Sequence, residues 1–166
     1  MLRLWQEGVP VQTTISLNGI VRDDWGLNWV KLPSGDNWLG LSDVPGWSKP
    51  TQVRVLIYPF GSSIPENDTI VNYLVNPIPI YANKVTEVRV SFTQLGYVHV
   101  ITNPSVPGTI YIDGVPVNDW GCWVPLLPGT YVLSFGDVPG FIKPPDVNVV
   151  VVAGTSTIVT GTYTST

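Results

Sequence analysis

The sequence predicts an all-β protein built from two small antiparallel β-sandwich modules in tandem. Sixteen Gly and sixteen Pro separate short runs rich in Val, Ile, Thr and Tyr, a pattern typical of many short strands joined by turns. Side chains suited to a core recur at every second position along several runs, as at 110–112 and 131–135. This period of two indicates strands with one buried face. Two long stretches of the chain also match each other in order and spacing, which indicates an internal repeat.

The repeat is visible as three matched pairs of segments. ISLNGIVRDDWG at 15–26 aligns with IYIDGVPVNDWG at 110–121, at an offset of 95. After a one-residue shift, an offset of 94 aligns DVPGWSKP at 43–50 with DVPGFIKP at 137–144. An offset of 71 then relates 78–93 to 149–164. Because this last offset is 23 residues smaller, the first copy contains an insertion of that length.

The insertion lies between the second and third matched segments, at about 51–77. The strand-like runs VRVLIY and TIVNYLV flank the turn-rich segment PFGSSIPEND, which predicts an added β-hairpin. The expected organisation is therefore an N-terminal arm at 1–7, a first module at 8–95 that contains the hairpin, and a second module at 96–166.

Each copy also contains a short turn signal. Asn18-Gly19 in the first copy aligns with Asp113-Gly114 in the second. Asn or Asp followed by Gly tolerates the positive φ angles that a two-residue type I′ turn requires. Both pairs therefore predict tight hairpins at corresponding places in the two modules.

The second copy resembles a known family. The runs NPSVPGTIYIDGVPV, LLPGTYVLSF and VPGF resemble the PEGA-type module, a small β-sandwich repeat, over about 60 residues. The first copy departs from this pattern, with Asn18-Gly19 in place of Asp-Gly and Pro33-Ser34-Gly35 in place of the Leu-Pro-Gly turn. The resemblance implies a stalk or interaction unit, since such modules occur in bacterial and archaeal surface proteins and are not known as catalytic units.

The resemblance also suggests a setting. Versions with the added Asp-Trp-Gly look like those of proteins from hyperthermophilic archaea and their viruses. The favoured function is therefore a non-enzymatic structural protein of a virus particle, a spike, turret or capsid-decorating subunit at the virion surface, although a fold alone never determines function. The alternatives are an extracellular filament or adhesin subunit of an archaeal cell surface, and a carbohydrate-binding module.

The low charge of the chain argues against some classes of partner. Charged residues make up only 12% of the sequence and the formal net charge is −4, so no basic face is expected for a nucleic acid. No stretch is long and apolar enough to insert into a membrane, and the amino terminus lacks the apolar core of a signal peptide. The expected partners are other structural proteins, in a homo-oligomer or a larger assembly, with host surface glycans as an alternative.

Five of the seven tryptophans are candidates for a contact surface. Four of them recur at matched positions, namely Trp25, Trp29, Trp120 and Trp123. They could form a glycan or protein contact surface, or one of each pair could close the open end of its module. Matched placement in both copies favours packing, because a duplicated core residue is retained by its neighbours. Trp5 lies outside the repeat and is the better candidate for an intermolecular contact.

Nothing in the sequence predicts a catalytic, cofactor or metal site. His99 is the sole histidine, and no G-x-S-x-G nucleophile motif accompanies it. Cys122 is the sole cysteine, which excludes an internal disulfide and a multi-thiolate zinc site. The recurring acids lack EF-hand spacing and are expected to accept backbone N–H groups in turns; they are Asp24, Asp43, Asp119 and Asp137.

One sequon is a candidate for modification. Asn67-Asp68-Thr69 matches the N-glycosylation acceptor pattern and falls in the inserted hairpin, where an exposed loop is expected. Asn103-Pro104-Ser105 is blocked by its proline. Asn67 is therefore the residue to examine if the protein meets a glycosylation machinery.

Overall fold

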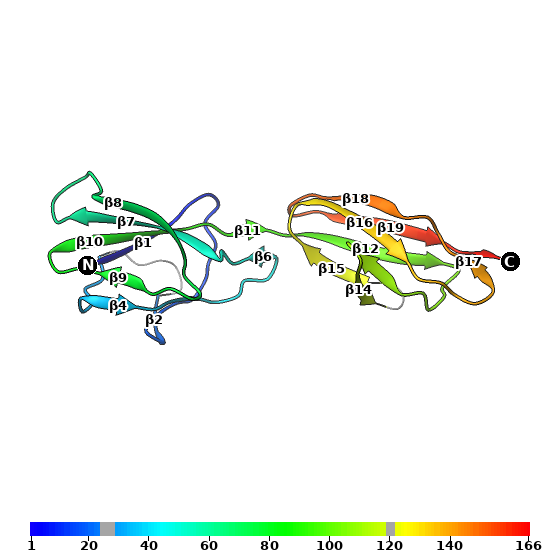
Figure 1. The fold of residues 1–166 in the computed structure, drawn as a ribbon, viewed down its shortest axis with the longest axis horizontal. Helices are drawn as coiled ribbons and strands as arrows, with labels where there is room; N and C mark the ends of the chain where they lie inside the picture. Colours follow the sequence, from blue (N-terminus) through cyan, green and yellow to red (C-terminus); the bar gives the residue numbers. More distant parts are fainter. Residues whose placement is uncertain (24–28, 119–121) are drawn as a thin grey trace. The chain divides into compact units, whose positions relative to one another are not determined.

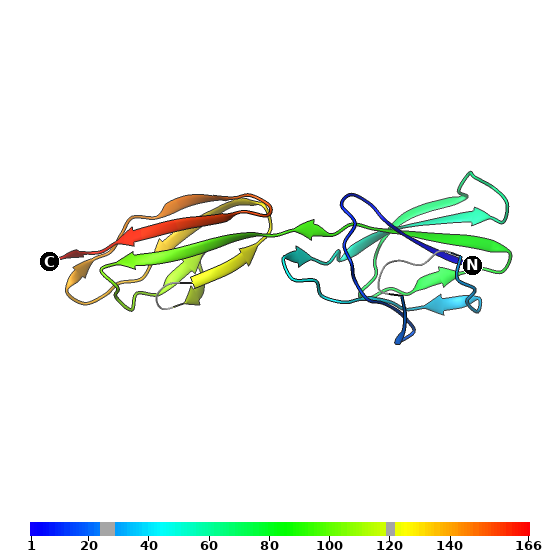
Figure 2. The same ribbon diagram turned by 180° about the vertical axis from the view of Figure 1, so that it is seen from behind.

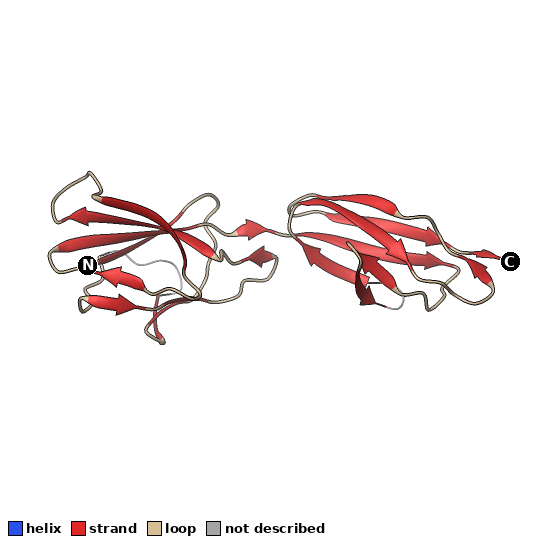
Figure 3. Ribbon diagram, viewed as in Figure 1, coloured by secondary structure: helices blue, strands red, loops and turns tan. Residues whose placement is uncertain are grey.

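The computed structural model describes residues 1–23, 29–118 and 122–166. All the regular elements in these ranges are strands, which confirms the all-β prediction (Figure 3). The chain divides into two compact units, Met1–Thr93 and Gln94–Thr166. Within the described ranges, no helix is long and apolar enough to cross a membrane. The expectations for Trp25, Trp120, Asp24 and Asp119 fall outside the described residues.

Unit 1 is built around a four-stranded sheet of order β1-β10-β7-β8, in which only β1 and β10 run parallel (Figure 1). The sheet β3-β2-β5 and the pair β4-β9 also belong to it, and β6 pairs with β11. Apolar side chains from these sheets form one core, which includes Leu4, Ile15 and Val88. The strands are β1 (Leu2–Gln6), β2 (Ile15–Leu17), β3 (Ile20–Asp23), β4 (Gly35–Asn37), β5 (Leu39–Leu41), β6 (Trp47–Ser48), β7 (Gln52–Pro59), β8 (Asn67–Asn72), β9 (Ile78–Ile80), β10 (Lys84–Val90) and, at the unit boundary, β11 (Thr93–Gln94).

Unit 2 contains a sheet of order β15-β12-β19 and a sheet of order β14-β13-β16-β18 (Figure 2). Side chains from both sheets, such as Val100, Ile110 and Phe135, pack into a second core. The short pair β17-β20 lies near the C-terminal end of the unit. The strands are β12 (Gly96–Asn103), β13 (Ile110–Ile112), β14 (Val115–Asn118), β15 (Cys122–Leu126), β16 (Gly129–Phe135), β17 (Phe141–Ile142), β18 (Val147–Val151), β19 (Ser156–Thr162) and β20 (Thr164–Ser165).

The strand pairings of the two units correspond residue by residue. Residues that are partners in unit 1 align, at the offsets read from the sequence, with residues that are partners in unit 2. The matched pairs include Ile15↔Leu41 with Ile110↔Phe135, and Gly35↔Ile80 with Gly129↔Val151. The sequence alignment does not cover β1, but its partner Thr86 aligns with Thr157, so the pairs Leu2↔Thr86 and Val98↔Thr157 match β1 with β12. Since register decides which side chains face the core, the two units bury corresponding positions.

The segment 1–7 does not form an arm, contrary to the sequence prediction. Leu2–Gln6 is strand β1, which pairs in parallel with β10 inside unit 1. Leu2 and Leu4 are 2% and 4% exposed and belong to the core. The sequence alignment does not include this segment, because β1 and β12 share few identical residues. They are alike in the alternation of buried and exposed side chains and in their parallel pairing with β10 and β19.

The insertion forms the hairpin expected for about 51–77. β7 and β8 are antiparallel, with Gln52 opposite Asn72 and Ile57 opposite Asn67. The structure adds that β7 also pairs with β10, so the hairpin extends a core sheet and is not an appendage. In unit 2 the strand that corresponds to β10 is β19, and it lies at the edge of its sheet because no inserted hairpin pairs with it.

A bidentate ion pair joins the two strands of this hairpin. Arg54 donates from Nε and Nη2 to the two carboxylate oxygens of Asp68, at 2.8 and 2.6 Å. The hydrogen bond from Arg54 holds the pKa of Asp68 below its usual value. Because the folded pKa lies below the unfolded one, the pair stabilises the hairpin above the unfolded pKa and ceases to do so as the pH falls through the folded pKa.

Both predicted two-residue turns are present. Asn18 and Asp113 have φ angles of 53° and 49°, and the glycine that follows each also has positive φ. The side-chain oxygen of each residue accepts an N–H from the neighbouring strand, Trp38 N–H at 2.8 Å and Val132 N–H at 2.7 Å. The same turn is therefore made with the same side-chain hydrogen bond in both units.

Replacing Asp113 with alanine is expected to lower the free energy of unfolding by about 1–2 kcal/mol. Alanine lacks the acceptor for Val132 N–H and adopts positive φ only with strain. Asp113→Asn is the matched control, because Asn18 makes the same turn in unit 1, and it is expected to cost less than about 0.5 kcal/mol. Urea unfolding measures both; equal losses for the two variants would contradict this explanation.

Candidate functional site

The two matched tryptophans that are described lie on the surface. Trp29 and Trp123 are 55% and 57% exposed, and neither belongs to a core cluster. Trp5, the candidate outside the repeat, is 48% exposed. These three side chains are therefore available for contacts, and they do not close the end of a module.

In unit 2, Trp123 is part of an exposed row across the sheet β15-β12-β19. Its indole stacks on the ring of His99, with centroids 4.1 Å apart and an interplanar angle of 20°. Ile158 lies opposite His99 on the other neighbouring strand and is 62% exposed. The face is apolar and aromatic, which is typical of a surface that binds another molecule rather than water.

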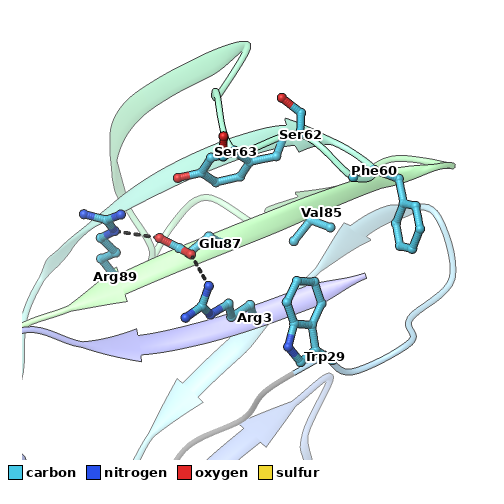
Figure 4. Close-up of a pocket in the computed structure, with 10 residues that line it drawn as sticks. Arg3, Trp29, Phe60, Ser62, Ser63, Val85, Glu87 and Arg89 are labelled. Atoms are coloured by element: carbon cyan, nitrogen blue, oxygen red, sulfur yellow. Dashed lines mark hydrogen bonds and ion pairs between the residues drawn. The ribbon is translucent and has the colours of Figure 1, made fainter.

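The corresponding face of unit 1 contains a pocket of about 480 Å³. It lies over strands β1, β7 and β10, beside Trp29 and the turn that joins β7 to β8 (Figure 4). Its polar lining comes from two arginines, one glutamate, Tyr58 and two serines, and its apolar lining from Trp29, Phe60 and Val85. This volume is in the range of small-molecule sites.

A compact ionic cluster forms the floor of the pocket. The Glu87 side chain is only 8% exposed and lies between Arg3 and Arg89 (Figure 4). Its Oε1 accepts a hydrogen bond from Arg89 Nε at 2.7 Å, and its Oε2 lies 3.3 Å from an Nη of Arg3. The hydrogen bond with Glu87 raises the pKa of Arg89. The buried carboxylate is thus neutralised from both sides, as burial of a charge requires.

Arg3 connects this cluster to the tryptophans. Its guanidinium carbon lies 5.0 Å from the ring centroid of Trp5 and 5.8 Å from that of Trp29, within cation–π range. Among the described residues, the buried Nε of Arg3 has no hydrogen-bond partner. The strand correspondence pairs Arg3 with His99 and Trp29 with Trp123, so each unit places a tryptophan beside the corresponding residue of its central strand pair.

The sequence reasoning missed Arg3, Glu87 and Arg89. A weak signal was present, because Glu87 and Arg89 alternate with the apolar Val88 and Val90 and so mark the outer face of a strand. Arg3 joins them only through the parallel pairing of β1 with β10, which sets Arg3 opposite Glu87. No local sequence pattern predicts a pairing between two strands that lie this far apart in the chain.

The remaining candidates lie apart from the pocket. Asp43 and Asp137 are highly exposed and form matched ion pairs with Lys49 and Lys143, at 2.9 and 3.4 Å. The described ranges contain no group of three or more His, Cys, Asp or Glu that could hold a metal ion. Asn67 is exposed, but it is the first residue of β8 and not a loop residue as the sequence suggested.

Comparison with known proteins does not name a family. No family model matches the sequence, and no curated protein matches it either. Function is therefore inferred from the repeated pairings, the exposed faces and the pocket.

Proposed function

We propose that the chain is a non-enzymatic structural protein made of two PEGA-like β-sandwich modules in tandem, the first with an added hairpin. The observation that supports this most strongly is the residue-by-residue correspondence of strand partners in the two units. Repeated modules with separate cores are a common means of building stalks and extended contact surfaces. The motifs shared with PEGA-type modules point to the same role.

We further propose that the chain is displayed on a virus particle, as a spike, turret or capsid-decorating subunit from a hyperthermophilic archaeal setting. Its exterior is poor in charge and includes many exposed large apolar side chains, among them Trp5, Trp123 and Ile158. Exposed apolar faces of this kind mark sites that other subunits cover. Copies of this chain and other structural proteins are the expected partners.

Counting the chain in purified particles tests this proposal. Quantitative mass spectrometry is expected to find it in a constant ratio to the major structural proteins, and antibodies against the recombinant chain are expected to label the particle surface in electron micrographs. Trace amounts in purified particles, with no surface labelling, would overturn the assignment to a virion.

One observation favours the second candidate, an archaeal cell-surface filament or adhesin subunit. β18 is an edge of its sheet, and the run from Val147 to Val152 contains neither a charged residue nor a proline. Val150 and Val152 are 59% and 53% exposed. Such an unprotected edge can accept a strand from a neighbouring subunit. Labelling of filaments on cells, and not of particles, would favour this candidate over the first.

A further inference from the structure

We propose that the pocket of unit 1 binds an acidic sugar, a uronic acid unit of a glycan, with its carboxylate at the arginines and its ring against Trp29. This inference goes beyond the structural role, since a scaffold needs no small-molecule pocket. It assigns a binding function to Arg3, Arg89 and Trp29, which lie together only in the folded unit (Figure 4).

The free N–H donors of the two arginines favour a ligand with acceptor oxygens. Two arginines and one glutamate line the pocket, and Arg89 also pairs with Glu7 at 3.4 Å, so the charges of this group balance. Each oxygen of Glu87 is already engaged by one arginine, whereas each guanidinium has five N–H donors. The pocket therefore offers more donors than acceptors. A carboxylate matches this surplus, because it pairs with guanidinium groups through short, charge-assisted hydrogen bonds.

The aromatic lining favours a ligand with a ring. Phe60 and Trp29 line the pocket and are 64% and 55% exposed, so a large part of each ring is accessible to a ligand. The C–H groups of a sugar ring are slightly positive and pack well on the negative face of an indole. Ser62 and Ser63 add hydroxyl groups that can hydrogen-bond to sugar hydroxyls.

The backbone of Trp29 is a second, independent observation. Its φ angle is +59°, a left-handed conformation that is unusual for a bulky aromatic residue. Such strain persists where the surroundings impose it, and it concentrates at ligand sites. Here the conformation holds the indole at the rim of the pocket, beside Arg3.

The corresponding face of unit 2 lacks the charged residues of the pocket. The strand correspondence places Ile158 where unit 1 has Glu87, and Thr160 where unit 1 has Arg89. The exposed tryptophan is retained, but the two arginines are not. Trp123 is therefore a matched control for Trp29, with nearly the same exposure.

Isothermal titration calorimetry of the full chain tests the proposal, with trigalacturonate, uncharged galactotriose and acetate as probes. Saturable binding of trigalacturonate is expected, with affinity at least about tenfold weaker for the other two probes. Failure to bind trigalacturonate would overturn the proposal. Equal affinity for galactotriose would overturn the role of the arginines, and equal affinity for acetate would overturn the role of the ring.

Three variants locate the binding. Trp29→Ala and Phe60→Ala are expected to weaken trigalacturonate binding by about tenfold or more, and Trp123→Ala to leave it unchanged. Because Phe60 is largely exposed, its truncation does not threaten folding, and thermal unfolding checks each variant. A loss with Trp123→Ala equal to that with Trp29→Ala, or no loss with either rim variant, would overturn the assignment to this pocket. All these outcomes are independent of whether the chain is found in virions.

Discussion

Gly161→Val is expected to destabilise unit 2 by about 3 kcal/mol, because a side chain there has no space. A Cβ atom at Gly161 would overlap the ring of Phe135. That ring is 2% exposed, belongs to the core and meets Tyr163 edge-on with centroids 6.3 Å apart. A buried ring held in this way cannot move aside without disturbing its neighbours.

Unit 1 supplies the compensating change. At the positions that correspond to Phe135 and Gly161 it has Leu41 and Val90, which are 7% and 1% exposed in its core. Phe135→Leu alone is expected to cost about 1–2 kcal/mol through the space it leaves. The double variant Phe135→Leu, Gly161→Val is expected to be more stable than Gly161→Val alone by about 2 kcal/mol.

Urea unfolding of the four proteins in this cycle measures the coupling. A double variant whose loss equals the sum of the two single losses would contradict the claim that ring and glycine share one space. Val159→Ala provides a control for truncation elsewhere in β19, since it changes the same strand without adding volume.

Glu87→Ala is expected to lower the free energy of unfolding by about 2–3 kcal/mol. The carboxylate is the common partner of Arg3 and Arg89, and its removal leaves Arg3 without its ion-pair partner and Arg89 with Glu7 alone, at 3.4 Å. Because both arginine side chains are 31% exposed, solvent reduces the cost below that of a fully buried pair.

The matched control replaces the whole cluster by its unit 2 counterparts, Arg3→His, Glu87→Ile and Arg89→Thr. This triple variant is expected to lie within about 1 kcal/mol of the parent protein, since it removes Glu87 together with both arginines and leaves only the solvent-exposed Glu7 without its partner. Thermal and urea unfolding measure both variants. A triple variant less stable than Glu87→Ala would contradict this explanation. It would show that the ion pairs themselves stabilise the unit, and that unpaired charge is not the main cost.

Local features of the fold were predictable because their causes are local. Asn18-Gly19 and Asp113-Gly114 make the expected turns, since few other residues tolerate positive φ at both central positions. The hairpin of β7 and β8 was predictable for a similar reason, because two strand-like runs flank a turn-rich segment. The segment 1–7 was misjudged because its role depends on a strand far along the chain.

The candidate site was predictable only in part. Trp5 and Trp29 were singled out from the sequence, and both lie beside Arg3 in the structure. Trp29 and Trp123 were named both as contact candidates and as candidates for packing, because duplication alone does not tell whether a position is retained by packing or by a shared surface; both are exposed. Glu87 and Arg89 were not among the residues singled out from the sequence.

The sequence by itself determined the strand-rich character of this protein, the positions of its turns and the register in which its two copies align. These features follow from side-chain alternation and from backbone angles, which neighbouring residues control. Only the tertiary structure decided that β1 enters a sheet beside β10 and that Arg3 meets Glu87. A parallel pairing between distant segments is selected by the burial of a whole core, and that selection leaves no signature in any short stretch of sequence.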